Sequence, residues 1–179
     1  GLKFLYQSAM ASRSKGWDRS MFDYGIEFEP GYTNYKKSLL LSLNLMKYSH
    51  KIKKLLGIKS SLKIAQKEVA VKNYDITWQQ ILDKKPSAKN AIPSAFVDWD
   101  NTPRKQQAGS VYEGATPKKF KKYFKQLVKK TKEEYKTDKI FVFAWNEWAE
   151  GGYLEPDEKY GYGYLEAIRD VLEETKQFK

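Results

Sequence analysis

Residues 139–152, KIFVFAWNEWAEGG, contain the clearest strand signal in the chain. Positions 140–145 are apolar on both faces, which is typical of a parallel strand covered by helices. Acidic and polar residues follow at once, and Gly151 and Gly152 favour a sharp turn because glycine adopts conformations closed to other residues. The pattern predicts a buried parallel strand that ends in a polar turn.

Extended runs alternate with helical runs over the rest of the chain, which is typical of α/β proteins with a parallel sheet. The residue pattern predicts five strands, at Leu2–Tyr6, Tyr24–Phe28, Glu68–Val71, Ser94–Asp98 and Lys139–Trp145. The fold class expected from this alternation is α/β, with parallel strands covered by helices.

The strongest helix signal begins at Thr116-Pro117, a capping hydroxyl followed by proline at the first helical position. The helix then carries a buried stripe with lysines opposite, and the stripe consists of Phe120, Phe124, Leu127, Thr131 and Tyr135. Two further helices are predicted, at Thr77–Lys84 and at about Tyr164–Lys176.

The length of 179 residues predicts a single domain, residues 1–179, and a hydrophobic content of 41% predicts that it folds. The chain contains no run of roughly 18 apolar residues, so the sequence predicts no membrane span. The first ten residues lack the charged and apolar regions of a signal peptide, and we therefore expect a cytoplasmic location.

The chain has no cysteine and a single histidine, His50. This composition removes disulfides, thiolate metal sites and cysteine nucleophiles, and leaves a histidine-based zinc centre or a Ser-His-Asp triad short of partners. We expect no metal and no cofactor. The remaining carboxylates, tyrosines and tryptophans suit sugar chemistry, which uses paired carboxylates.

The net charge of +11 is concentrated in residues 31–70, which hold nine lysines and one acid. These lysines form a solvated face, or a patch for anionic lipid, lipid-linked phosphate or polyanionic glycan. Only four of the 33 basic residues are arginine, which argues against nucleic acid as a partner. Residues 35–67 are predicted as a basic helical or loop insertion, with a membrane-surface helix as the alternative.

Acids and tryptophans follow three predicted strands, at the strand ends where parallel α/β folds place their ligand sites. Glu147 and Glu150 are three residues apart, so a helical turn would bring their β-carbons to about 5–6 Å from each other. Retaining glycosidases use carboxyl groups about 5–5.5 Å apart. Such pairs also occur on exposed helices, but the preceding strand and the neighbouring tryptophans favour a site.

For other residues at this edge, the alternative to a role in binding is a structural role. Asp98 and Asp100 are typical of turn capping. Glu27 is either a ligand of the substrate or a buried strand acid paired with lysine or arginine, and Arg104 either binds a carboxylate or sugar hydroxyl or forms a surface ion pair. Residues 160–164, YGYGY, are interpreted as a turn with aromatic packing.

Residues 144–151 (AWNEWAEG), 154–157 (LEPD), 160–167 (YGYGYLEA) and 99–104 (WDNTPR), together with Phe22-Asp23 and Glu27-Phe28, resemble the WbsX family of bacterial polysaccharide-biosynthesis proteins. That family looks like a relative of glycoside hydrolase family 99, the endo-α-mannosidases and mannanases. The resemblance implies a (β/α)8 TIM-type barrel, of which this chain supplies the C-terminal part, about five strands, without the N-terminal strands.

The resemblance also implies catalytic roles. Glu150 would be the general acid/base, and Glu147 would be the base that draws a proton from the 2-hydroxyl of the sugar. Ala149 departs from the hydrolases, which usually carry histidine there. The implied substrate-binding residues are Glu27, Trp99, Asp100, Asn101, Arg104, Trp145, Asn146, Trp148 and Glu155.

The sequence thus favours a carbohydrate-active enzyme that cleaves an α-linked glycan, with mannose as a candidate sugar, with retention. The alternatives are a glycosyltransferase-type protein of lipopolysaccharide, O-antigen or capsule biosynthesis, and a non-catalytic glycan-binding fragment. In the second case the lysine-rich segment 36–67 would make a peripheral membrane or lipid-phosphate contact. Asp98-Trp99-Asp100 is the one candidate for a metal-binding Asp-x-Asp.

Overall fold

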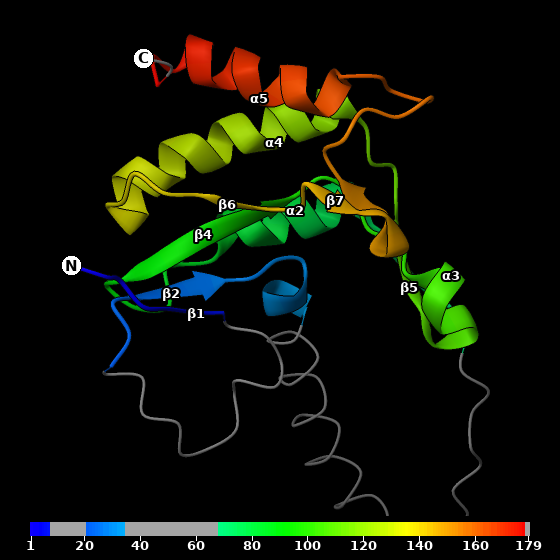
Figure 1. Ribbon diagram of the computed structural model, residues 1–179, viewed down its shortest axis with the longest axis horizontal. Coiled ribbons are helices and arrows are strands. Elements are labelled where there is room, and N and C mark those ends of the chain that lie inside the picture. The colour runs from blue at the N-terminus through cyan, green and yellow to red at the C-terminus, as the bar shows by residue number, and fades with distance from the viewer. Residues whose placement is uncertain (8–20, 35–67, 178–179) are drawn as a thin grey trace, which may run out of the picture.

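The structure is a computed structural model that describes residues 1–7, 21–34 and 68–177 (Figure 1). The predicted insertion 35–67, with its lysines and His50, lies outside the described residues. None of the helices within the described ranges is both long and apolar enough to cross a membrane.

A four-stranded parallel sheet forms the centre of the fold, which confirms the predicted α/β class. Ile26 lies opposite Ile92, and Ala95 lies opposite Val142. The strand order is β1-β2-β4-β6, and the strands are β1 (Leu5–Gln7), β2 (Tyr24–Glu27), β4 (Ala91–Phe96) and β6 (Phe141–Phe143).

The prediction of five strands in one sheet is wrong for the third of them. Residues 68–71 contribute to β3 (Ala70–Asn73), but β3 pairs in parallel with β5 (Ser110–Glu113) in a separate two-stranded sheet. No strand was predicted at β5, because its four residues contain no continuous apolar run. Four parallel strands are half the number in a (β/α)8 barrel, so the observed sheet is compatible with part of one.

Each helix begins where the sequence provides a cap or a turn. Thr116 Oγ1 accepts a hydrogen bond from Lys119 N–H at 3.2 Å, as predicted. Asn73 Oδ1 accepts one from Ile76 N–H at 2.9 Å, so the second predicted helix begins three residues earlier than expected. The helices are α2 (Tyr74–Asp83), α4 (Pro117–Lys130), continued by a π-helical turn over Thr131–Tyr135, and α5 (Gly163–Glu174).

Aromatic side chains fill the layer between helices and sheet. The Trp78 ring of α2 stacks on Phe96 of β4 and on Tyr123 of α4, with ring centroids 5.6 and 5.7 Å apart. One aromatic stack therefore joins a strand of the sheet to both helices. Helix α5 lies along α4, which in turn contacts α2 and β4 (Figure 1). The predicted stripe of α4 is buried along its whole length, from Phe120 to Tyr135.

An ion cluster lies within this layer. Glu27 and Glu29, at the end of β2, are both almost fully buried. Lys84, just beyond α2, places its Nζ 3.0 Å from Glu27 Oε2 and also bonds to Glu29. Tyr135 donates a hydrogen bond to Glu27 Oε2 at 2.7 Å, and Ser87 N–H donates to Glu27 Oε1 at 2.7 Å. The cluster therefore ties β2 to the ends of α2 and α4.

The charges of the cluster stabilise one another. Burial acts to raise the pKa of Glu27, but Lys84 and the hydrogen bonds from Ser87 and Tyr135 outweigh it and hold that pKa below its ordinary value. Burial acts to lower the pKa of Lys84, but the two carboxylates outweigh it and raise that pKa. Both effects favour the charged forms in the folded protein.

Removal of Lys84 should therefore destabilise the fold strongly. We expect Lys84→Met to lower the free energy of unfolding by about 3–5 kcal/mol at pH 7, because it leaves buried carboxylates without a partner. Lys85→Met is the matched control, since the Lys85 side chain is 84% exposed, and it should change stability by less than about 1 kcal/mol. Urea unfolding followed by circular dichroism measures both.

The effect should depend on pH. The pKa of Glu27 is depressed on folding, so the stability it contributes is present above about pH 4.3, its ordinary value, and is lost as the pH falls below that. The stability difference between wild type and Lys84→Met should accordingly shrink on acidification. Equal losses for the Lys84 and Lys85 variants would contradict the role of the cluster.

Candidate active site

The segments that follow β4 and β6 meet at the carboxyl edge of the sheet, as predicted. Asp100 N–H donates a hydrogen bond to the Glu150 carbonyl at 2.8 Å. Tyr112 N–H donates to the Trp99 carbonyl at 2.9 Å, which fixes β5 to the same segment. Residues about 50 positions apart in the sequence are thereby brought side by side.

The two predicted catalytic glutamates lie in one short hairpin. Its strands β7 (Asn146–Glu147) and β8 (Gly152–Tyr153) are antiparallel, and Trp148–Glu150 form a 3₁₀ turn between them. The prediction that one helical turn carries both glutamates is therefore wrong for Glu147, which ends a strand. The backbone at Glu147 is held by the pairing of β7 with β8 and not by the hydrogen bonds of a helix.

The glycine pair has the predicted function of allowing a tight turn. Gly151 adopts a left-handed conformation with φ +63°, and a β-carbon there would lie 3.0 Å from Asp100 N. A β-carbon on Gly152 would lie 2.4 Å from Phe143 Cε1. Only residues without a side chain let the hairpin lie this close to β6 and to the segment after β4.

Glu150 is paired with Arg104. Arg104 Nη2 donates to Glu150 Oε1, and the Glu150 side chain is only 13% exposed. Arg104 lies in the short helix α3 (Thr102–Lys105), whose first residue donates its N–H and its hydroxyl to Asp100 Oδ1 at 2.9 and 2.6 Å. Asp100 thus caps the turn that presents Arg104, and Arg104 compensates the charge of an ionised Glu150.

Trp148 and Tyr153 form an aromatic platform next to the glutamates. Their rings stack with centroids 3.7 Å apart, and Trp148 remains 50% exposed. Trp148 Nε1 donates to Glu155 Oε2 at 2.6 Å, which fixes the indole. A cavity of about 620 Å³ adjoins the platform and is lined by both rings and by Pro156, Asp157, Glu158 and Lys159.

Other predicted binding residues are dispersed. Trp145 and Asn146 are exposed at the start of the hairpin. Asn101 is buried, and its side-chain oxygen accepts a hydrogen bond from Ser110 N–H at 2.8 Å, so it holds β5 in place. Glu27 lies in the ion cluster with Lys84, as its structural alternative predicted. The geometry gives Asn101 and Glu27 structural roles.

Trp99 lies in the segment that follows β4 and contacts β6. Its ring packs against Phe143 at 5.3 Å, and its buried Nε1 has no hydrogen-bond partner among the described residues. Within the same part of the chain, no three His, Cys, Asp or Glu side chains lie together as metal ligands would.

Asp98 is a candidate that the sequence analysis assigned to turn capping or to a metal-binding Asp-x-Asp, and not to the site residues. Its Oδ1 does accept a hydrogen bond from Trp99 N–H, at 2.7 Å. Burial raises the pKa of Asp98 to about 6, while this bond and the charge of Lys159 partly oppose the rise. The buried Tyr164 hydroxyl, which interacts electrostatically with Asp98, has no partner among the described residues. Tyr153, the other missed residue, carried no sequence signal beyond its aromatic type.

Comparison with known proteins gives a consistent result. Two proteins named "Uncharacterized protein WxcX", from two strains of Xanthomonas campestris pv. campestris, are similar to this chain. One is 37% identical over 101 residues, which is 53% of this chain and 14% of the relative. The other is 31% identical over 103 residues, which is 54% of this chain and 15% of the relative. The matched segment is therefore a small part of each relative.

No solved structure matches the chain. A family model described as "Glycosyltransferase WbsX" matches residues 1–168. Because this match covers most of the 179 residues, the chain belongs to the WbsX glycosyltransferase family.

Proposed function

We propose that this chain forms part of a carbohydrate-active site of the glycoside hydrolase family 99 type, which cleaves an α-linked glycan with retention. The observation that carries the proposal is the hairpin at the carboxyl edge, where Glu147 and Glu150 stand beside the platform of Trp148 and Tyr153. Family membership supports it. In this proposal the parallel sheet is part of a (β/α)8 barrel, whose carboxyl face holds the active site.

The proposed reaction divides the chemistry between the two glutamates. Glu147 accepts the proton of the sugar's 2-hydroxyl, and that oxygen attacks the anomeric carbon to give a 1,2-anhydro sugar. Glu150 donates its proton to the leaving glycosidic oxygen as the bond breaks. In the second step Glu150 takes a proton from water, which opens the anhydro sugar while Glu147 returns a proton to the 2-oxygen. Two inversions give net retention.

Arg104 sets a condition on this reaction. A general acid must carry a proton, whereas an arginine partner favours the ionised carboxylate. Arg104 must therefore leave Glu150 when substrate binds. Its side chain is 53% exposed on a four-residue helix, so it can turn to a sugar hydroxyl without disturbing buried packing.

Burial raises the pKa of Asp98 to about 6, so a carboxyl group at this edge keeps its proton to a higher pH than a solvent-exposed one. Asp98 and Asp100 also repel each other electrostatically. Ionisation of Asp98 therefore costs folding free energy and places a second negative charge near Asp100. Protonation of Asp98 relieves both.

Substitution of the glutamates tests the proposed reaction. We expect Glu150→Gln and Glu147→Gln each to lower reducing-end release from α-linked oligosaccharides by about 10²–10⁴-fold, the usual contribution of a general acid or base. Glu173→Gln, an exposed glutamate of α5 outside the candidate site, is the matched control and should retain activity. The measurement uses the protein at its full natural length with a panel of α-linked glycans.

The same experiment contains the result that would overturn hydrolysis. A folded wild-type protein that binds glycan but releases no reducing ends from any member of the panel would contradict the proposal. Extension of an acceptor glycan from an activated donor, lost in Glu150→Gln, would instead establish the transferase that the family description names.

Asp98→Asn tests the charge at this edge. The pKa of Asp98 is raised on folding, so the protein loses stability as the pH rises from about 4 to about 6. We expect the variant to be more stable than wild type at pH 8, by at most about 3 kcal/mol, and equally stable near pH 4. Thermal unfolding across this range measures the difference. If the stability difference between Asp98→Asn and wild type is the same at pH 4 and at pH 8, ionisation of Asp98 has no cost in folding free energy and the expectation is wrong.

A further inference from the structure

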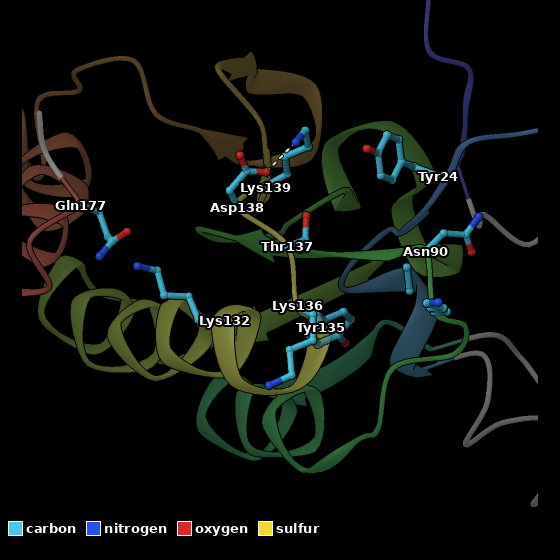
Figure 2. Close-up of a pocket in the computed structure, with 11 residues that line it drawn as sticks. Tyr24, Asn90, Lys132, Tyr135, Lys136, Thr137, Asp138, Lys139 and Gln177 are labelled. Atoms are coloured by element: carbon cyan, nitrogen blue, oxygen red, sulfur yellow. Dashed lines mark hydrogen bonds and ion pairs between the residues drawn. The ribbon is translucent and has the colours of Figure 1, made fainter.

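The strongest unexplained feature lies at the opposite end of the sheet from the glutamates. A cavity of about 620 Å³ opens where the strands begin, beside Tyr24 of β2, Ala91 of β4 and Lys139, just before β6 (Figure 2). The π-helical turn after α4 and Gln177, beyond α5, complete its wall. The candidate active site follows the other ends of β4 and β6, so the two regions are separated by the length of the sheet.

This cavity is strongly basic. Lys89, Lys132, Lys136 and Lys139 line it, with Asp138 as its only acidic lining residue. A second cavity of about 440 Å³ adjoins it along α4, shares Lys132 and Gln177 with it, and is lined further by Lys122, Lys125 and Lys129. We refer to these seven lysines together as the basic face.

Most of the positive charge on the basic face is uncompensated. Three of the seven lysines form ion pairs. Figure 2 marks the pair of Lys139 and Asp138, in which the ammonium nitrogen lies 2.5 Å from a carboxylate oxygen. The corresponding distances are 2.7 Å for Lys125 and Glu174 and 3.9 Å for Lys129 and Glu133. The remaining four lysines of the basic face have no ion-pair partner in the part of the chain that the structure describes.

Helix electrostatics account for only part of this surface. Lysines in the last turn of a helix offset the partial negative charge of its carbonyls, which explains Lys129. Lys89 and Lys139 instead come from the loops before β4 and β6. Lys136 has a left-handed backbone with φ +54°, a position where glycine or asparagine is the usual residue. The positive charge is thus gathered from several elements.

We infer that the basic face docks on an anionic lipid membrane. The lysines are exposed and spread over two cavities, and Figure 2 shows Lys132 and Lys139 on different elements around the first of them. This arrangement suits a diffuse surface charge better than a discrete phosphate. Lysine supplies point charges, whereas bidentate recognition favours arginine. Each lysine near such a membrane contributes about 1 kcal/mol of binding.

The test is co-sedimentation of the full chain with vesicles of phosphatidylcholine containing about one third phosphatidylglycerol, a composition with strong negative surface potential. The double variant Lys132→Gln/Lys136→Gln should bind about 30-fold more weakly than wild type, which is the loss of two lysine contributions. Lys105→Gln/Lys159→Gln removes the same charge from exposed positions at the carboxyl edge of the sheet, away from the basic face, and should bind within about threefold of wild type. Pure phosphatidylcholine vesicles should bind neither.

Three outcomes would overturn the inference. The first is absence of binding to the anionic vesicles. The second is an equal loss in both double variants, which would place binding elsewhere, including residues 35–67. The third is displacement by millimolar inorganic phosphate at constant ionic strength, or tighter binding to a soluble acidic polysaccharide than to vesicles. Retained activity of Lys132→Gln/Lys136→Gln on a soluble glycan would show that docking and the proposed reaction are separate.

Discussion

Two buried carboxylates that share one ammonium group hold the sheet and its helices together. Glu27 and Glu29 are almost inaccessible to water, so their charges must be compensated inside the protein. Lys84 reaches them from the end of α2, and Tyr135 reaches Glu27 from the turn after α4. Ser94 of β4 donates its hydroxyl to the Glu27 carbonyl at 2.7 Å. The position of every neighbouring element is therefore coupled to this cluster.

The sequence predicted those parts of the fold whose signal is local. The two-sided apolar run at 140–145 and the Thr116-Pro117 cap led directly to β6 and α4. The strands β5, β7 and β8 are two to four residues long and partly exposed, and they carry no such signal, whereas β3 was predicted as a strand but not its partner β5. Their pairing depends on contacts between segments far apart in the sequence, which periodicity does not report.

The same distinction applies to the site. The turn at Gly151 and the position of Glu150 after the strand follow from residue type and order, whereas the exposure of Trp148 does not, because tryptophan is usually buried. The orientation of Glu27 toward the helices does not, because a strand presents alternate residues to opposite faces and residue type alone does not say which face the helices cover. The raised pKa of Asp98 also has a non-local cause, since burial comes from residues brought in by other segments.

The charge of the protein is divided between the two ends of the sheet. The carboxyl edge gathers Asp98, Asp100, Glu147 and Glu150 with one arginine, whereas the opposite edge and α4 carry the lysines of the basic face. A neutral glycan gains nothing from distant lysines, so the excess of positive charge has no role in the proposed reaction. A surface that meets an anionic membrane through the beginnings of the strands would leave their carboxyl ends, and the hairpin with both glutamates, facing away from that membrane. Opposite charge at opposite ends of a parallel sheet would thus orient the molecule on such a membrane.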